Sequence, residues 1–366
     1  MSEVFILGAG FSKAISSEMP LVKELSALVL KLYRRKDFIE SDVRRMMEED
    51  FEKTLTYLSQ EKPWLHESEN LRHKALYLDL TNVIRGIIHE KSRCPLTWGS
   101  NQPDLWIEAL ITYWHNNRCI VITLNYDTLI ECVASAIHWR HRSKPIPTGQ
   151  LYPIPFTPVG QRGTTIVGDD PVKTFKFFKL HGSINWVYSG RSDFFGEELF
   201  YVPCSGGLNG SFDDYFYGDP EKSDWGKASD KSALIIPPTL DKSAFFQHES
   251  LRSMWLEASR EIKNASKIIC MGYSLPMSDL TMAQFLKTSA PIRQIPFELV
   301  DISPKCSEHF SNVLGNGTYN FRQEITDEDC IPKFVVKNCV SDEEDKKHVI
   351  RMSRWNTTTH LADDHK

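Results

Sequence analysis

Long apolar runs are missing from this sequence. No stretch of the 366 residues approaches the roughly 18–20 consecutive apolar residues that a membrane-spanning helix requires, so no membrane span is predicted. The first residues, Met1–Phe5, also lack the basic segment followed by an apolar segment that marks a secretory signal. We therefore expect a soluble, cytoplasmic protein that makes no membrane contact.

Clustered cysteines are missing as well. The eight cysteines lie singly along the chain, and none belongs to a Cys-x-x-Cys pair. Neither a disulfide framework nor a zinc ribbon is predicted, and we expect no bound metal.

An excess of one charge is also absent. The 43 Lys and Arg residues nearly balance the 48 Asp and Glu residues, which leaves a net charge of −5. Such a surface is poorly suited to neutralising many phosphates, so direct binding of nucleic acid is not expected. Hydrophobic residues make up 41% of the chain, an ordinary globular share that supplies at least one large core.

What the sequence does contain is a repeated alternation of short apolar runs and helical patterns. The runs are rich in β-branched and aromatic residues, as is typical of strands buried on both faces of a parallel sheet. They lie at residues 4–7, 119–124, 175–180, 267–271 and 297–302. This order predicts an α/β protein with a Rossmann-like open parallel sheet and helices on both faces.

The stretch from about residue 20 to 116 differs from the rest, because its apolar residues recur every three or four positions. This spacing predicts a large helical insertion within one domain that spans residues 1–340. The sheet core is expected at about 1–20 and 117–305, and residues 341–366 are expected to form a polar C-terminal tail. Trp106, Trp114, Trp186 and Trp255 stand in apolar contexts and are expected in the core.

Glycine-rich or polar clusters follow each of the five predicted strands. They are found at residues 8–12, 125–127, 181–183 and 272–274 and at Asp301. Ligands of open parallel sheets bind beyond the carboxyl ends of the strands. We therefore expect these clusters to form one site.

Each cluster taken alone leaves alternatives open. The Gly8–Gly10 turn would let the backbone approach a pyrophosphate at a helix N-terminus, or it is a structural turn only. Asp127 is a candidate ligand contact or a helix cap, and His181 is a candidate base or a structural histidine. Hydride transfer is the weakest reading, because the glycine fingerprint is incomplete and the expected acidic residue is missing.

Taken together, the clusters resemble the motifs of sirtuins in order and approximate spacing. The matching segments are GAGFS at 8–12, TLNYDTL at 123–129, KLHGS at 179–183 and GYSLP at 272–276. They are most similar to divergent bacterial sirtuin-like proteins that consume NAD in antiviral defence, in which a helical insertion is also typical. The resemblance implies NAD⁺ as substrate and cleavage of its nicotinamide–ribose bond to give nicotinamide and ADP-ribose.

The resemblance also implies a role for each matching residue. The expected catalytic residues are Asn125, at the nicotinamide ribose, and His181, as general base. The expected NAD-binding residues are Gly8, Ala9, Gly10 and Ser12 at the pyrophosphate and ribose, Asp127 at the nicotinamide pocket, Gly272 and Ser274 on the adenosine side, and Asp301 at the adenine ribose. Phe11 and Thr123, which lie within the matching motifs, are also expected to bind NAD.

Two departures from ordinary sirtuins bear on the reaction. Leu124 stands where they have glutamine, and residues 184–232 contain only Cys204 in place of a four-cysteine zinc module. That module supports the cleft for an acyl-lysine peptide, so its absence argues against deacylation. The alternatives that remain are NAD-dependent deacylation, ADP-ribosyl transfer to protein, and a non-catalytic scaffold subunit that binds NAD or ADP-ribose.

Hydrolysis needs few protein groups. Nicotinamide leaves as a neutral molecule, so its departure requires no general acid. Asn125 is expected to orient the ribose and the attacking water, and His181 to accept a proton from water or a ribose hydroxyl. A histidine has an ordinary pKa near neutrality, which suits a base.

An enzyme that destroys NAD must be silent in healthy cells, and the resemblance therefore implies gating. We expect a homo-oligomer, or a partner such as a hexameric helicase- or translocase-type ATPase or another phage sensor, acting in abortive infection. The chain itself has no Walker GxxxxGK[ST] motif. The trigger is then a separate protein or the helical insertion.

Overall fold

The structure is a computed structural model of the 366-residue chain. It describes residues 2–33, 41–93, 105–141, 148–154, 156–158, 173–188, 199–202, 232–237, 248–277, 279–315, 317 and 319–352. Cys204 and residues 353–366 of the expected tail lie outside the described residues.

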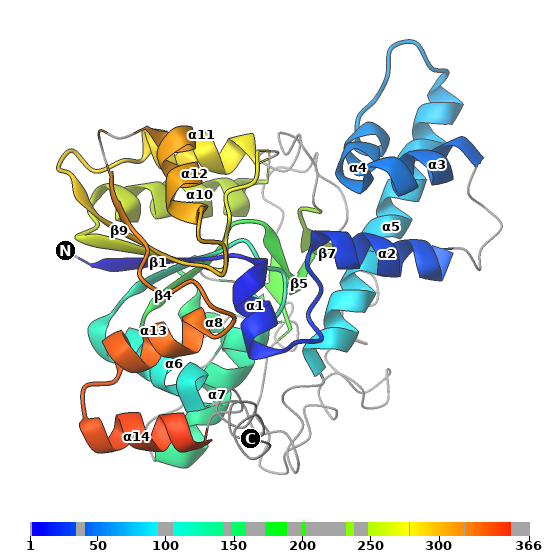
Figure 1. Ribbon diagram of the computed structural model, residues 1–366. Helices are drawn as coiled ribbons and strands as arrows, with labels where there is room; N and C mark the ends of the chain where they lie inside the picture. The colour runs from blue at the N-terminus through cyan, green and yellow to red at the C-terminus, as the bar shows by residue number, and fades with distance from the viewer. Residues whose placement is uncertain are drawn as a thin grey trace, which may run out of the picture.

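A parallel sheet forms the centre of the protein (Figure 1). Its strands are β1 (Glu3–Leu7), β2 (Ile120–Thr123), β4 (Lys176–Lys179), β8 (Lys267–Met271), β9 (Ile295–Val300) and β10 (Tyr319–Arg322). They lie in the order β10-β9-β8-β1-β2-β4, and every neighbouring pair is parallel. Counted along the chain, this is the 3-2-1-4-5-6 order of the Rossmann fold. The predicted fold class is confirmed.

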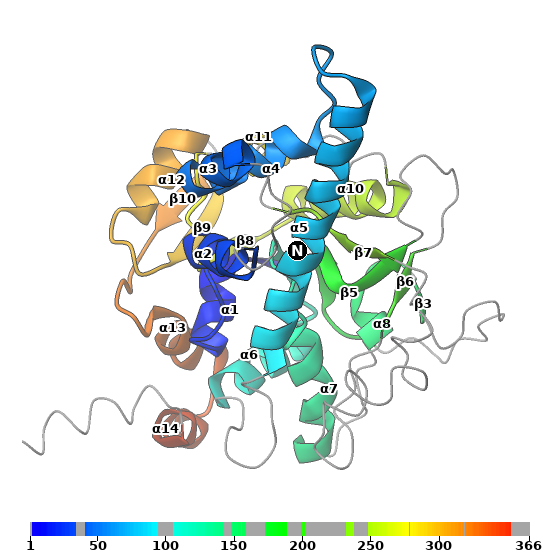
Figure 2. The same cartoon turned by 90° about the vertical axis from the view of Figure 1, so that its right-hand side faces the viewer.

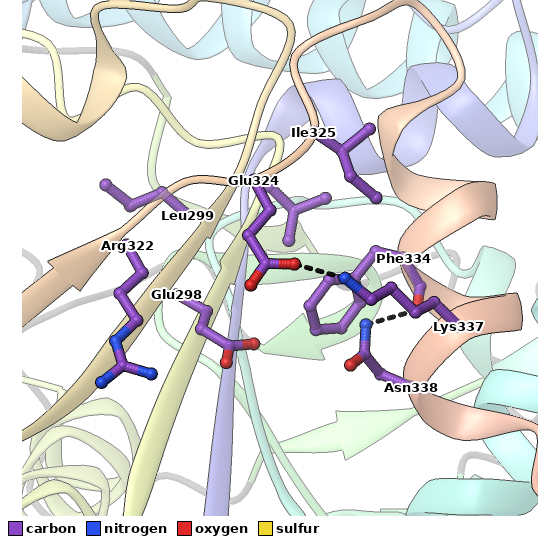
Figure 3. A pocket seen from close by; sticks show the side chains of 9 residues that line it. Glu298, Leu299, Arg322, Glu324, Ile325, Phe334, Lys337 and Asn338 are labelled. Carbon is purple, nitrogen blue, oxygen red and sulfur yellow. Dashed lines mark hydrogen bonds and ion pairs between the residues drawn. The ribbon is translucent and has the colours of Figure 1, made fainter.

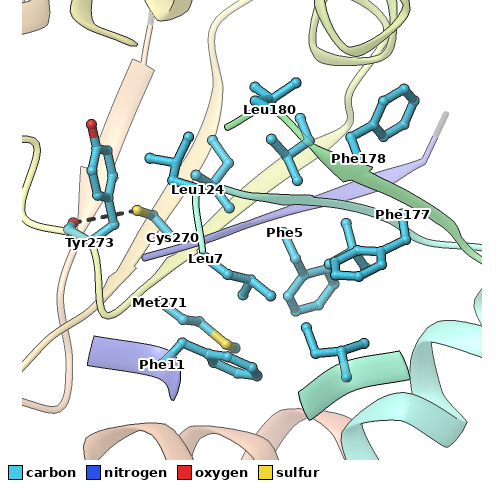
Figure 4. Packing of buried hydrophobic residues seen from close by; sticks show 14 of the residues in the cluster. Phe5, Leu7, Phe11, Leu124, Phe177, Phe178, Leu180, Cys270, Met271 and Tyr273 are labelled. Atoms are coloured by element: carbon cyan, nitrogen blue, oxygen red, sulfur yellow. Dashed lines mark hydrogen bonds between the residues drawn. The ribbon is translucent and has the colours of Figure 1, made fainter. Parts of the chain in front are cut away.

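Helices cover both faces of this sheet (Figure 1). One layer contains α10 (Glu249–Lys263), α11 (Leu280–Thr288) and α12 (Cys306–Leu314). The other contains α1 (Ala9–Ile15), α6 (Leu105–Asn117), α7 (Leu129–His141) and α13 (Cys330–Cys339). Because both faces are covered, the strands carry apolar residues at successive positions rather than at alternate ones. Figure 4 shows Phe177 and Phe178 of β4 pointing to opposite faces, and both are buried.

Helix α6 belongs to the core, although the sequence pattern placed it at the end of the helical insertion. Its buried residues include Trp106, Ile107, Leu110, Ile111 and Trp114, which have no exposed surface. The Trp114 ring lies edge-on to Phe5 of β1 at a centroid distance of 5.4 Å. Parallel strands such as β1 and β2 need a crossover that packs on the sheet, and α6 supplies it.

The helices that stand apart from the sheet layers are α2 (Val22–Tyr33), α3 (Ser41–Glu49), α4 (Phe51–Ser59) and α5 (Glu67–Arg93). They project to one side of the molecule, and α5 packs against β5 and β7 of a second sheet (Figures 1 and 2). Helix α4 begins at a side-chain cap, because the Asp50 carboxylate accepts a hydrogen bond from the Lys53 amide.

The second sheet was not predicted. It contains β3 (Thr157–Pro158), β5 (Gly182–Tyr188), β6 (Phe200–Tyr201) and β7 (Ser232–Ile235) in the order β3-β6-β5-β7. Strand β5 starts immediately after His181 at Gly182, whose φ is +80°. A Cβ atom on Gly182 would lie 2.2 Å from the Leu234 carbonyl oxygen, so only glycine fits where the two sheets meet. The short helix α8 (Thr148–Leu151) lies beside α7.

The expected polar tail begins with a further helix, α14 (Glu343–Met352). It packs against α6 and α13, and Val349 is buried there while Ile350 packs on the core. Two adjacent apolar residues in a charged stretch therefore suffice to dock this segment. None of the helices in the described part of the chain combines the length and apolar character needed to cross a membrane.

Candidate functional site

The order in which the chain adds strands to the sheet reverses between the two central strands, β1 and β8. From β1 the chain moves one way to β2 and β4, and from β8 it moves the other way to β9 and β10. The crevice at such a reversal, beyond the carboxyl ends of the strands, is where ligands of open α/β sheets bind. Leu7 and Met271 are register partners at these ends, and the predicted glycine turns follow them.

The two glycine turns pack backbone against backbone. The Gly8 amide donates to the Met271 carbonyl oxygen (3.1 Å), and the Gly10 amide donates to that of Gly272 (2.9 Å). A Cβ atom on Gly10 would lie 2.9 Å from the Gly272 Cα atom, and one on Gly272 would lie 2.3 Å from the Phe11 nitrogen. Gly272 also has a φ of +60°. These glycines are therefore required by their mutual contact.

The main-chain amides of the first turn also make hydrogen bonds within the protein. The Phe11 amide donates to the Gly8 carbonyl oxygen (2.9 Å), so the amides of Gly8, Gly10 and Phe11 all have acceptors within the protein. In this turn, Gly8 and Gly10 are the residues at which a Cβ atom would collide with the main chain at Gly272.

The polar side chains of Ser12, Asn125 and Asp127 meet next to the first glycine turn. The Asn125 side-chain nitrogen donates to the Gly8 carbonyl oxygen (2.7 Å) and to the Ser12 hydroxyl oxygen (2.8 Å). The Ser12 hydroxyl donates to Oδ2 of Asp127 (2.6 Å). Ser12 and Asp127 are buried, while Asn125 is half-buried. The structure thus brings Ser12 together with two predicted residues that lie more than 110 positions further along the chain.

The direction of every hydrogen bond in this group is fixed. A main-chain carbonyl can only accept, so Asn125 must present its NH₂ group to Gly8 and to Ser12. The single Ser12 proton then goes to the Asp127 carboxylate. As a result the Asn125 carboxamide oxygen faces away from these contacts, and no group in the described part of the chain donates to it.

Asp127 and Thr123 hold the backbone of the same segment. The second carboxylate oxygen of Asp127 accepts from the Leu129 amide (3.1 Å) at the start of α7. The Thr123 hydroxyl oxygen accepts from the Asn125 amide (3.1 Å). One oxygen of Asp127 thus binds the first amide of α7, as the helix-cap interpretation expects, and the other binds Ser12.

His181 lies on the neighbouring chain segment, immediately beyond β4. The Leu180 amide donates to the Thr123 carbonyl oxygen (3.0 Å), which places this segment beside the turn that carries Asn125. The His181 carbonyl oxygen accepts from the Ile236 amide (2.8 Å), and its side chain is 6% exposed. His181 thus reaches the same edge of the sheet through a different strand.

Trp255, which the sequence analysis expects in the core, packs against the core and also contacts the segment that carries His181. Its indole nitrogen donates to the Leu180 carbonyl oxygen (3.0 Å), and its ring lies 6.2 Å from the His181 ring. The side chain is only partly buried. Its apolar helical spacing on α10 gave no sign of this contact, because the partner is a main-chain carbonyl 75 residues away.

The remaining predicted residues lie on the β8 and β9 side. The Gly272 amide donates to the Val300 carbonyl oxygen (2.9 Å), which joins the ends of these strands, and the Ser274 side chain is exposed. Asp301 is partly buried and accepts from the Ser303 amide (2.9 Å). Burial raises the pKa of the Asp301 carboxyl, and the Ser303 amide opposes that rise.

Two pockets formed by the described residues lie away from these side chains. A cavity of about 110 Å³ opens between β9, β10 and α13, where Glu324 pairs with Lys337 at 2.5 Å beside Arg322 and Phe334 (Figure 3). Another, of about 410 Å³, lies between α12 and β10. Neither is lined by a predicted site residue. The described residues contain no group of three or more His, Cys, Asp or Glu side chains placed to hold a metal ion.

No model of a known protein family matches the chain, and no curated protein matches its sequence. Among solved structures, one of Sir2 with the inhibitor EX-527, 2′-O-acetyl-ADP-ribose and a deacetylated p53 peptide matches at 12% identity and a TM-score of 0.37. That match covers 93% of this chain and 95% of the other. A structure from work on sirtuin substrate affinity matches at 13% identity and a TM-score of 0.37, covering 92% and 93%. The strand order, and not these matches, establishes the fold of this chain.

Proposed function

We propose that this protein binds NAD⁺ at the carboxyl ends of β1 and β8 and hydrolyses the nicotinamide–ribose bond of NAD⁺. The Rossmann strand order supports a dinucleotide as ligand, because its reversal point lies at the predicted glycine turns. The resemblance of four motifs to those of sirtuins supports NAD⁺ in particular. In this proposal the nicotinamide ribose lies at Asn125 and His181, and the adenosine lies toward Ser274 and Asp301.

The observation that carries the proposal is the fixed hydrogen-bond direction at Asn125. Because its NH₂ group is held by Gly8 and Ser12, its oxygen is the only part of the side chain left to meet a ligand. A fixed acceptor can orient a ribose hydroxyl or a water molecule without reorganising during the reaction.

The reaction we propose is NAD⁺ plus water giving nicotinamide, ADP-ribose and a proton. The bond from C1′ of the ribose to the pyridinium nitrogen breaks, and its electron pair leaves with nicotinamide, which becomes neutral. The C1′ centre acquires oxocarbenium character, and a water oxygen attacks it. The proton released from that water passes to the His181 ring, with Asn125 holding the water or the ribose.

The test is to incubate the purified chain with NAD⁺ and to separate the products by chromatography. We expect nicotinamide and ADP-ribose from the native protein, and at least a roughly 100-fold slower reaction for His181→Ala and Asn125→Ala. The exposed residues His348 and Asn312 give matched controls, because His348→Ala and Asn312→Ala remove the same side-chain types far from the site. Native rates in the first two variants would overturn the residue roles.

The same incubation distinguishes the alternatives. Label from adenine-labelled NAD⁺ that stays on protein would indicate ADP-ribosyl transfer. Nicotinamide release that depends on an acyl-lysine peptide would indicate deacylation. Binding without release, measured by calorimetry, would indicate a scaffold or an enzyme that lacks its activator. Absence of binding would refute the site.

The proposal extends to a cellular role, supported by the motif resemblance alone. We propose that the protein depletes NAD in antiphage defence by abortive infection and is gated by homo-oligomer assembly or by a partner such as a hexameric ATPase. Cellular NAD measured during phage challenge tests this. We expect a fall in cells with the native protein and none in cells with His181→Ala. A constant NAD level in both would refute the defence role.

A further inference from the structure

The turn that carries Asn125 and Asp127 is held from one side by the segment that follows β4. Three main-chain carbonyl oxygens of this turn accept hydrogen bonds from the end of β4 or from the segment that follows it. Leu180 donates to the carbonyl oxygen of Thr123 (3.0 Å) and Ile184 to that of Tyr126 (2.9 Å) through their amides. The carbonyl oxygen of Asp127 accepts from the Lys179 side chain instead. Two of these hydrogen bonds come from main-chain amides, and the donor of the third is a charged side chain.

Lys179 is an unusual residue to find in this place. It is the last residue of β4, and its side chain has no exposed surface. The ammonium donates to the Asp127 carbonyl oxygen and to Oε1 of Glu131 (2.8 Å), and it lies 5.6 Å from the centre of the Phe177 ring. The Glu131 side chain, in the first turn of α7, is equally buried.

The Glu131 carboxylate is held in turn by Tyr152, the residue that follows α8. The Tyr152 hydroxyl donates to Oε1 of Glu131 (2.9 Å). The Asn185 side chain of β5 donates to the Tyr152 oxygen (3.4 Å) and to the Val202 carbonyl oxygen (3.0 Å), and it accepts from the Ser183 hydroxyl (2.6 Å). The Lys179 ammonium is thus held by Glu131 of α7, which Tyr152 holds in turn, and Asn185 of the second sheet contacts Tyr152.

Stability does not account for this ion pair. Desolvating a lysine and a glutamate costs several kcal/mol for each ion, and replacing such a pair by apolar residues is often neutral or stabilising. The cost here is greater, because Oε2 of Glu131 is buried and has no partner among the described residues. What the pair does supply is a donor fixed against the Asp127 carbonyl oxygen, two residues from Asn125.

We propose that Lys179, oriented by Glu131, is a positioning residue that fixes the Asn125–Asp127 turn for catalysis. It acts through the Asp127 carbonyl and makes no contact with substrate. Its effect on turnover depends on the proposed NAD⁺ hydrolysis, whereas its effect on the Asn125 side chain does not. The pair also explains why a lysine precedes the histidine motif at the buried end of β4.

The informative variant replaces both charges, because removing one would leave the other buried and unpaired. Lys179→Met with Glu131→Leu keeps the volume and removes the anchor. The matched control is Lys176→Met with Glu261→Leu, an ion pair of 2.5 Å at the opposite end of the same strand. We expect kcat for NAD⁺ to fall about 100-fold with KM unchanged in the first protein, since roughly 1 Å of misplacement has that effect. The control is expected to keep the native kcat.

A second readout does not require turnover. In protein labelled with ¹⁵N-asparagine, the Asn125 side-chain NH₂ signals are those lost in Asn125→Ala. We expect these signals to shift in the Lys179/Glu131 double variant and to be unchanged in the Lys176/Glu261 control. If native protein hydrolyses no NAD⁺, the proposed function fails, and this shift alone decides the positioning role.

Unchanged Asn125 signals in the double variant would overturn the proposal, and so would a shift that leaves kcat at the native value. If the double variant does not fold, the isosteric Glu131→Gln variant replaces it, because it keeps the volume and removes the charge that orients Lys179. We then expect a smaller shift of the same signals and a several-fold fall in kcat. Native values of both would overturn the proposal.

Discussion

The Asn125→Asp substitution tests the hydrogen-bond direction in the site most directly. It changes one NH₂ group into an oxygen and leaves the shape of the side chain almost unaltered. In the native protein that group donates to the Gly8 carbonyl oxygen at 2.7 Å and to the Ser12 oxygen at 2.8 Å. In the variant a carboxylate oxygen would face a carbonyl oxygen that can only accept.

The cost follows from these contacts. Losing the two donated hydrogen bonds costs about 2 kcal/mol, while the Gly8 carbonyl oxygen keeps the Phe11 amide as a donor. Only the Ser12 hydroxyl separates the new carboxylate from Asp127, so the two groups lie about 5 Å apart and their repulsion adds about 3 kcal/mol at an effective dielectric constant near 20. We therefore expect a loss of about 4–6 kcal/mol at pH 7.5. This corresponds to a fall in Tm of about 5–8 °C for a chain of this length.

Acid should restore the variant. The surroundings raise the pKa of the new carboxyl above its ordinary value of about 3.9, so the folded state binds a proton that the unfolded state releases. The stability of the variant then falls as pH rises through this window and recovers as pH falls. Once protonated, the carboxyl introduced by Asn125→Asp would again donate to the Gly8 carbonyl oxygen.

Thermal unfolding followed by circular dichroism at pH 5 and pH 7.5 checks this prediction. Asn125→Ala removes the donors without adding charge and is expected to lose about 2 kcal/mol at both pH values. Asn264→Asp changes an exposed asparagine whose nitrogen also donates to a main-chain carbonyl (2.9 Å), and it should have a much smaller effect. Equal Tm values for Asn125→Asp at the two pH values would refute the assigned hydrogen-bond direction.

Three further substitutions test other parts of the site. Gly272→Ala should lower the free energy of unfolding by at least about 3 kcal/mol, because Gly272 has a positive φ and contacts Phe11 closely. Its control, Gly86→Ala on an exposed face of α5, should raise the free energy of unfolding by up to about 1 kcal/mol; thermal unfolding measures both. Burial raises the pKa of Asp301, so the folded protein loses stability as pH rises above about 4. The Asp301→Asn variant should therefore resist urea unfolding better than the native protein at pH 7, and the two proteins should be equally stable near pH 4. Trp255→Phe removes one hydrogen bond to the carbonyl oxygen before His181 and keeps a ring, so it should cost about 1 kcal/mol and lower NAD⁺ turnover several-fold; native turnover would remove it from the site.

The sheet was predictable because its strands carry their signal locally. Apolar runs buried on both faces mark β1, β2, β4, β8 and β9 within one or two residues. Strand β10 was missed because its four residues alternate buried and exposed positions at the edge of the sheet, and the second sheet was missed because β3 and β6 have two residues each. Such short strands are defined by their partners rather than by their own sequence.

The site was predictable in its location and less so in its contacts. The rule that parallel strands end at one edge was enough to group Ser12, Asn125 and Asp127. It gave no information on Lys179, because a lysine at the end of a strand is usually exposed, and only the fold shows its buried partners Glu131 and Asp127. The same rule correctly located the glycine turns, but it did not show that they pack on each other.

The central position of β1 has a consequence for how the protein is made. Residues 3–7 are synthesised before both of their partners, because they pair with residues 120–123 on one side and with 267–271 on the other. At about 5–20 residues per second, the second partner follows some 260 residues later, after roughly 13–50 seconds. During that interval β1 has an unpaired edge, and the contact between Gly10 and Gly272 does not exist. The two glycine turns therefore come together only after the segment that carries β8 has been synthesised.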